Sequence, residues 1–212
     1  MPVTKTPRVD AQRNRQALLV KAREIFDAGD AEIPFDDFAR RAGVGIGTLY
    51  RHFPTRQELA LAVYHEEIAL LCARANQLRA ELSGADALAA FLRGMIDYMD
   101  SHRGLARALA KLMSNRSEAI AEHSAILEKA VTGLMTDAVE QGAIRSDVSA
   151  GAVMTALHGV GAGLDSPDWR LRAEEVITLL LDGLRQLPTA SNPSGVKRAV
   201  GRKVPTKTNP HR

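Results

Sequence analysis

The sequence predicts an all-α fold, and three observations support this prediction. Apolar residues recur at intervals of three and four along most of the chain, as in Leu18, Ala22 and Ile25, and this spacing places them on one face of a helix. Glycine and proline stand where these periodic stretches end, which is typical of helix termini. No stretch alternates apolar and polar residues in the way that predicts a half-buried strand.

The first 60 residues predict a flexible arm followed by a group of helices. Residues 1–9 contain two prolines and no apolar periodicity, so we expect the arm there. A helix is expected to begin at Asp10 and to end at Gly29. Two shorter helices follow, over residues 36–42 and from about 46 to 53.

The remainder of the chain also predicts helices. Thr55 is expected to cap a long helix that continues to Leu82, with Glu58 as its capping-box partner. Ser166 and Pro167 form an N-cap and first-turn pair for the last helix. The helices expected after the long one cover residues 85–101, 104–114, 117–141, 148–164 and 168–187.

The composition excludes several classes of protein. The 212 residues are 45% hydrophobic with a single cysteine, Cys72, which excludes an intrachain disulfide framework and a multi-cysteine metal site. No phosphate loop, catalytic triad or metal-ligand spacing is found, so we expect neither an enzyme nor a cofactor. No apolar run is long enough for a membrane span and no signal peptide is found, so we expect a cytoplasmic protein. Cys72 is either a small buried hydrophobe or a redox sensor.

The net charge of +3 is distributed unevenly. It is +2 over residues 1–60, −5 over residues 61–187 and +6 over residues 188–212. Basic ends on an acidic body suggest a polyanionic partner for the ends. Residues 188–212 lose all periodicity, so we expect a disordered basic tail that either tethers the chain nonspecifically to such a partner or has no role.

Residues 35–53 form a helix-turn-helix pattern. Phe38 lies on the inward face of the first short helix, and Gly43 can take the positive φ that a sharp turn requires. Val44 and Leu49 are expected to fill the angle between the two helices. The second helix presents polar side chains outward, and its N–H groups suit a phosphate, so this pattern indicates DNA binding.

This stretch resembles the TetR family of bacterial transcriptional regulators. The resemblance lies in three runs, Ala42-Gly-Val44, Gly47-Thr-Leu-Tyr-Arg-His-Phe53 and Pro54-Thr-Arg-Gln-Glu-Leu59. It implies a DNA-binding domain at residues 10–60 and a homodimer that binds a palindromic operator in double-stranded DNA. The expected DNA contacts, which include two arginines before the motif, are Arg13, Arg15, Gly45, Ile46, Gly47, Thr48, Tyr50, Arg51, His52, Thr55 and Arg56.

The chain departs from the family's pattern at four positions of the motif. Pro34 and Asp36 stand where a capping threonine and a polar or basic residue are common. Gly45 and Ile46 stand where a serine and a polar or basic residue are common. We therefore expect fewer or different operator contacts, and we hypothesise that Ile46 packs on a thymine methyl group.

The last two predicted helices carry apolar residues spaced alternately by four and three, which is typical of helices that pack side by side at a shallow angle. The apolar stripe that these residues form on each helix is buried either inside one subunit or at a subunit interface. The last helix is apolar on more than one face, and the resemblance implies dimerisation through a four-helix bundle of these helices. The expected interface residues are Val153, Leu157, Val160, Leu164, Ile177, Leu180 and Leu184.

The resemblance also implies a pocket for an unidentified small-molecule effector in a regulatory domain at residues 61–187. The effector would release a repressor from its operator by shifting the long helix between two arrangements. The candidate lining residues, each of which could instead be core, are Met95, Tyr98, Met99, His102, Met113, Leu127, His158 and Trp169. His102, His123 and His158 lack a ligand spacing, so no metal is expected. The alternative is an architectural DNA-binding protein of the same fold without a metabolite ligand.

Overall fold

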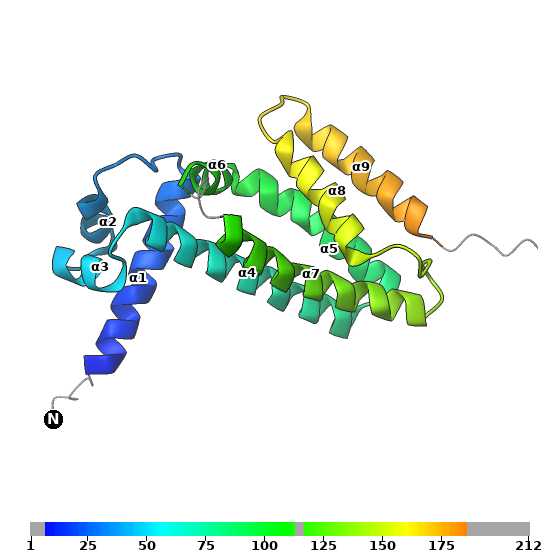
Figure 1. Cartoon of the computed structure of the whole chain (residues 1–212), viewed down its shortest axis with the longest axis horizontal. Helices are drawn as coiled ribbons and strands as arrows, with labels where there is room; N and C mark the ends of the chain where they lie inside the picture. The colour runs from blue at the N-terminus through cyan, green and yellow to red at the C-terminus, as the bar shows by residue number, and fades with distance from the viewer. Residues whose placement is uncertain (1–6, 113–116, 186–212) are drawn as a thin grey trace, which may run out of the picture.

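The computed structural model describes residues 7–112 and 117–185, and the regular secondary structure of this part of the chain is α-helical (Figure 1), which confirms the predicted all-α fold. None of the described helices is long and apolar enough to cross a membrane. The helices are α1 (Pro7–Asp27), α2 (Phe35–Ala42), α3 (Ile46–His52), α4 (Arg56–Glu81), α5 (Gly84–Ser101), α6 (Arg103–Leu112), α7 (Ser117–Glu140), α8 (Ala150–Ala162) and α9 (Trp169–Leu184).

Several helix boundaries differ from the prediction by one to three residues, and two of these differences have a clear physical reason. α1 begins at Pro7 rather than at Asp10, because proline is favoured in the first turn of a helix; residues 1–6 of the predicted arm lie outside the described residues. α9 begins at Trp169, and Ser166 does not cap it as predicted. Instead the carbonyl oxygen of Ser166 accepts the N–H of Trp169 at 3.1 Å, which closes a turn before the helix. The predicted tail at residues 188–212 also lies outside the described residues.

One hydrophobic core holds the N-terminal helices together. It contains residues of α1, α2, α3 and the first turns of α4, with the Phe26 and Phe38 rings 5.5 Å apart at its centre. α6 adds Leu105 and Ala108 to this core. The sequence places α6 in the regulatory domain, so its packing on α1 is a feature that only the structure reveals.

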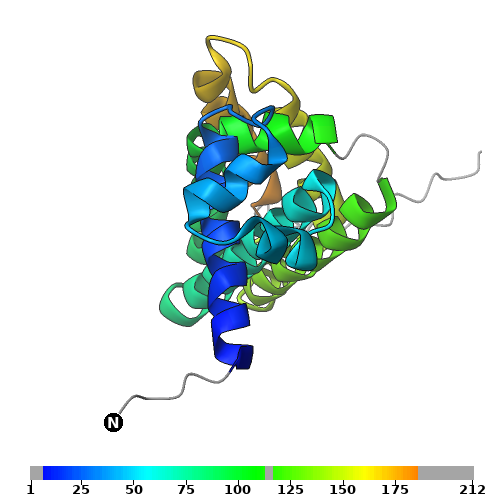
Figure 2. The same cartoon turned by 90° about the vertical axis from the view of Figure 1, so that its left-hand side faces the viewer.

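A second core is formed by the rest of α4 with α5, α7, α8 and α9. α4 belongs to both cores, since Leu59 and Val63 are buried in the first and Ile68 and Leu78 in the second. Figure 1 shows α2 and α3 at one end of the molecule, with α4 leading away from them into the helical body, and Figure 2 looks onto that end. α4 therefore connects the two cores, and α6 packs against the one that contains α3.

Candidate nucleic-acid interface and internal cavity

The turn between α2 and α3 determines the angle between these helices. Gly43 has a left-handed backbone conformation with a φ of 69°, which residues with a Cβ atom rarely adopt. Its N–H donates to the carbonyl of Arg40 at 3.2 Å, and the next N–H, of Val44, donates to the carbonyl of Ala39 at 3.0 Å. These bonds end α2 in the manner of a glycine C-cap. Gly43 therefore has the positive φ that the sequence predicts.

The outer side of α3 is open to solvent. Ile46 is 44% exposed and Tyr50 is 46% exposed, whereas Leu49 is fully buried against the other helices. A side chain at Gly47 would meet no atom within 4 Å. The other predicted contacts in or beside α3 are exposed or half-buried, and they are Gly45, Thr48, Arg51 and His52. These residues can be reached from solvent, and their contact with DNA stays a prediction.

Two residues of α2 hold Tyr50 in place. The Tyr50 ring meets the Phe35 ring edge to face, with centroids 5.4 Å apart. The Tyr50 hydroxyl donates a hydrogen bond to Asp36, and this bond raises the pKa of Tyr50 above its ordinary value. Asp36, which departs from the family's pattern, thus orients a tyrosine on the predicted DNA-facing side.

Two residues predicted to contact DNA have structural roles at the start of α4. Arg56 donates hydrogen bonds to the carbonyls of Ala31 and Ile33, and its guanidinium lies 5.6 Å from the centre of the Phe38 ring. Arg56 thereby ties the loop between α1 and α2 to α4, a role that the sequence does not predict. The hydroxyl of Thr55 accepts the N–H of Glu58 at 3.2 Å, which confirms the predicted N-cap.

Arg13 and Arg15 are exposed on α1. The Arg15 guanidinium lies 5.4 Å from the centre of the Phe53 ring, directly after α3. This contact places a cation beside the end of α3. A role of these two arginines at the DNA backbone stays a prediction.

A cavity of about 300 Å³ lies between α4, α5, α6 and α8. Four of the eight predicted pocket residues line it, namely Tyr98, Met99, His102 and His158. The sequence analysis missed its other lining residues because most of them are small or aliphatic and indistinguishable from core. They are Tyr64, Leu105, Ala106, Leu109, Ala110, Gly161 and Leu164.

The other four predicted pocket residues lie elsewhere. Met95 and Leu127 are buried in the second core, which is the alternative that the sequence left open. Trp169 is also buried and donates its indole N–H to the carbonyl of Val160 at 2.6 Å. Met113 lies outside the described residues.

Glu67 is a buried charge next to the cavity wall. Its side chain is almost fully buried, and it is the one charged residue that is buried in residues 9–111 and 124–185. Its carboxylate forms an ion pair with Arg23 of α1 and accepts a hydrogen bond of 2.9 Å from the Tyr98 hydroxyl. Burial and the negative charge of Glu67 raise the pKa of Tyr98 far above its ordinary value, so the hydroxyl keeps its proton. Sequence reasoning missed Glu67 and Arg23, since no spacing indicates that α1 and α4 meet at these residues.

His102 stands at the junction of the cavity and α1. Its ring stacks on the Tyr98 ring with centroids 4.4 Å apart, and its Nδ1 lies 2.9 Å from the backbone oxygen of Tyr98. Its Nε2 lies 3.9 Å from Asp27 Oδ2. Burial raises the pKa of the Asp27 carboxyl above its ordinary value, and the His102 charge opposes this effect.

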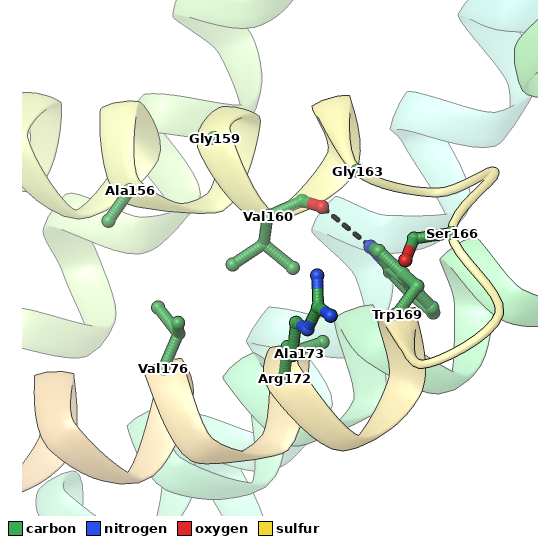
Figure 3. Close-up of a pocket in the computed structure, with 9 residues that line it drawn as sticks. All are labelled: Ala156, Gly159, Val160, Gly163, Ser166, Trp169, Arg172, Ala173 and Val176. Atoms are coloured by element: carbon green, nitrogen blue, oxygen red, sulfur yellow. Dashed lines mark hydrogen bonds between the residues drawn. The ribbon is translucent and has the colours of Figure 1, made fainter.

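A second hollow, of about 340 Å³, lies between α8 and α9. Figure 3 shows Val160 of α8 joined by a hydrogen bond to Trp169 of α9, with Gly159 on the first helix and Val176 on the second. The hollow is lined mainly by small and apolar residues. Arg172 is its charged member.

The structure corrects the predicted dimer interface. Six of its seven residues are buried inside the single chain and the seventh is partly buried, so the stripe is core rather than interface. The buried six are Val153, Leu157, Val160, Leu164, Ile177 and Leu184, and the seventh is Leu180. The physical reason is that each helix carries two largely apolar stripes of the same spacing. The second stripe is displaced by one residue along the chain, which turns it by about 100° around the helix axis. That neighbouring stripe is exposed apart from the half-buried Ala156, and it consists of Ala152, Ala156 and Gly159 on α8, Gly163 directly after it, and Arg172, Val176, Leu179 and Gly183 on α9.

The fold and the exposed α3 define a helix-turn-helix DNA-binding regulator. The family model described as bacterial regulatory proteins of the tetR family matches residues 18–63, and the one described as the SbtR-like transcriptional regulator C-terminal domain matches residues 83–186. A TetR transcriptional regulator from Streptomyces coelicolor has a crystal structure that is 39% identical with a TM-score of 0.62, and the match covers 83% of this chain and 99% of that one. The chain belongs to the TetR family of transcriptional regulators.

Two further proteins are similar over different extents. An HTH-type transcriptional regulator of Staphylococcus aureus is 27% identical over 104 residues, which are 48% of this chain and 56% of that protein. The chain thus spans about half the length of the curated relatives that it matches. FadR of Thermus thermophilus, described as a TetR family transcriptional repressor in complex with lauroyl-CoA, is similar in fold, with 20% identity, a TM-score of 0.60, and coverage of 85% of this chain and 100% of that one.

Proposed function

We propose that the chain is a homodimeric repressor that binds a palindromic operator through α3 and leaves it when a small molecule occupies the cavity. The position of α6 carries this proposal, since Leu105 belongs both to the N-terminal core and to the cavity lining. A molecule in the cavity therefore touches a helix that packs on α1. If it fits one arrangement of α4 and α6 better than another, it shifts their populations. Such a protein would act in the cytoplasm.

The proposed operator contacts come from α3 and the start of α1. Arg51 is an exposed cation that suits phosphate, and Thr48 can donate to phosphate or a base edge. The two glycines at the start of α3 let its backbone approach the DNA closely. A short helix with few polar side chains gives one copy little base readout, so two copies spaced by about one helical turn of DNA would be needed for a specific site.

The outward stripes of α8 and α9 are the proposed dimer interface. Leu179 is 73% exposed and Val176 is 39% exposed. Both lie on the same face of α9 as Arg172, at intervals of four and three residues. The hollow beside Gly159 leaves room for a side chain of a second copy (Figure 3). Small residues on α8 would allow α8 and α9 of the second copy to approach closely and form a four-helix bundle.

The cavity favours a ligand-responsive regulator over an architectural protein. A protein that only shapes DNA has no use for a hollow bordered by the helix that supports α1. The fold itself accommodates small molecules, as the lauroyl-CoA complex of FadR illustrates for that protein. The volume of about 300 Å³ is at the lower end of ligand pockets, so the proposed effector is a small molecule.

Footprinting of the DNA that flanks the chain's own gene tests the proposal. The wild-type protein should protect one short palindromic site, and the double substitution Thr48→Ala with Arg51→Gln should abolish protection. Arg74→Ala is the matched control, because Arg74 is exposed on α4 away from α3. Many dispersed protected sites that survive the α3 substitutions would contradict the proposal.

Release by a ligand is tested with a variant that fills the cavity. A compound that releases the wild-type protein from this site should have no effect on Gly161→Leu. The new side chain would project toward Met99, whose sulfur lies 3.8 Å from the position of a Cβ at Gly161. A compound that releases both proteins equally would show that the cavity is not the effector site.

A further inference from the structure

We propose that Glu67 fixes the Tyr98 hydroxyl as a hydrogen-bond acceptor toward the cavity, so that the cavity selects an uncharged, largely apolar small molecule that donates a hydrogen bond. This inference rests on the proposed function, because it assigns the chemistry of the effector that the cavity would bind. It concerns the polar wall of the cavity, where Tyr98 lies between the ligand space and a buried carboxylate.

The direction of the Tyr98 hydrogen bond determines what its hydroxyl group can offer to a ligand. A tyrosine hydroxyl has one proton to donate and two lone pairs that accept. That proton is committed to Glu67 Oε2 at 2.9 Å, and Glu67 as a carboxylate can only accept. Glu67 is held in place by its ion pair with Arg23 through Oε1, so the hydroxyl cannot turn its proton to a ligand without depriving the buried Oε2 of its hydrogen bond. Toward the cavity, Tyr98 therefore offers lone pairs.

The charges around the cavity do not favour an anionic ligand. Neither lysine nor arginine is found among the described residues that line it. Arg23 is close, but its guanidinium is paired with Glu67. Asp27 adds a further carboxylate behind His102. An anionic ligand would lose its hydration and meet no fixed cation, which is costly, so the cavity disfavours acids.

The remaining residues that line the cavity are mostly apolar. Apart from the two tyrosines and two histidines, the lining residues are aliphatic, sulfur-containing or glycine. The Tyr64 hydroxyl has Ser124 as its partner, whereas the Tyr98 hydroxyl is oriented by a buried carboxylate, so we assign the acceptor role to Tyr98. A ligand with an apolar frame and one hydroxyl or N–H group fits this arrangement.

Three probes of one shape separate the alternatives, and calorimetry measures their binding to the full chain without DNA. The probes are 4-butylphenol, which donates a hydrogen bond, its methyl ether, which only accepts, and 4-butylbenzoate, which is an anion. At pH 8 we expect the phenol to bind about three- to tenfold more tightly than the ether, as one additional hydrogen bond would give. The benzoate should bind more weakly than both.

Two variants locate the preference. Tyr98→Phe should reduce the affinity for the phenol to that for the ether and leave the affinity for the ether unchanged. Tyr64→Phe is the matched control, since it removes the other tyrosine hydroxyl of the cavity and should preserve the preference. A circular dichroism melting curve confirms that each variant is folded.

The wild-type comparison alone can overturn the inference. Equal affinity for phenol and ether, tighter binding of the benzoate, or no binding of any probe would each contradict it. Preference for the phenol that persists in Tyr98→Phe would also contradict it. These outcomes are distinct from failure of the proposed function, which is decided by protection of a single operator site and by the Gly161→Leu variant.

Discussion

His102 Nε2 lies 3.9 Å from Asp27 Oδ2, and this pair joins the end of α5 to the end of α1. His102 lines the cavity, whereas Asp27 belongs to the helix that supports α3. Nδ1 of His102 faces the backbone carbonyl of Tyr98, so Nδ1 is the ring nitrogen that donates a hydrogen bond to it. The pair is therefore a contact between the cavity wall and the helices that carry α3.

The first prediction concerns the stability of the Asp27→Asn variant as a function of pH. Burial raises the folded-state pKa of Asp27 above its unfolded value, so protonated Asp27 contributes stability that is lost as pH rises through the folded pKa. The variant should resemble wild type near pH 4, the ordinary range of an Asp carboxyl, and gain stability relative to it as the pH rises above that range. Urea unfolding at several pH values measures the difference. A variant that is less stable than wild type at pH 7 would show that the attraction to His102 outweighs burial.

The second prediction compares two glycines. A side chain at Gly104, in the first turn of α6, would collide with the backbone carbonyls of Phe26 and Asp27 in α1, whereas one at Gly94 of α5 would meet nothing within 4 Å. Gly104→Ala should therefore lower the free energy of unfolding by roughly 1–3 kcal/mol. Gly94→Ala should raise it by up to about 1 kcal/mol, since alanine favours the helix. Urea unfolding measures both, and equal effects would contradict the close contact of α6 with α1.

The third prediction separates two arginines beside the motif. Arg51 is exposed on α3, whereas Arg56 bonds to the carbonyls of Ala31 and Ile33. Arg51→Gln should weaken operator binding and reduce the slope of log affinity against log salt by about 1, with unchanged stability. Arg56→Gln should lower the free energy of unfolding by about 1.5–3 kcal/mol. Binding titrations at several salt concentrations and urea unfolding test both, and the reverse pattern would assign the phosphate contact to Arg56.

The fourth prediction tests the proposed dimer interface. Leu179→Asp on α9 should convert the dimer to a monomer, because two leucine side chains lose their burial and two charges would enter the interface. The loss of apolar burial alone corresponds to at least about a 100-fold weaker dimer. Leu70→Asp is the matched control, since Leu70 is 53% exposed on α4. Sedimentation equilibrium measures both, and a dimer that survives Leu179→Asp would place the interface elsewhere.

The residues of α8 and α9 show why the sequence predicts the fold better than the interface. Val153 and Ala152 belong to stripes of identical spacing, one buried and one outward. Spacing establishes that a helix has an apolar stripe, but both stripes here consist largely of apolar or small residues. Only the position of the neighbouring helices decides which stripe they cover, and that position depends on the packing of the whole chain.

The candidate cavity illustrates the same limit. Tyr98, Met99, His102 and His158 could be named from the sequence as residues suited to a pocket, yet Met95 and Leu127 have the same character and are core. Glu67 and Arg23 are 44 residues apart in the sequence, and no local pattern connects them. Their pairing arises because α1 crosses α4 next to the cavity.

Local interactions are the part that the sequence determined by itself. The helix periodicity, the Thr55 cap, the turn at Gly43 and the exposed face of α3 depend on residues within a few positions of one another, so their patterns can be read along the chain. The tertiary structure decided which of two equal stripes is buried, that Arg56 clamps a loop, and that a buried carboxylate lies behind the cavity wall. These features depend on contacts between distant segments, whose geometry is specified only when the helices pack together.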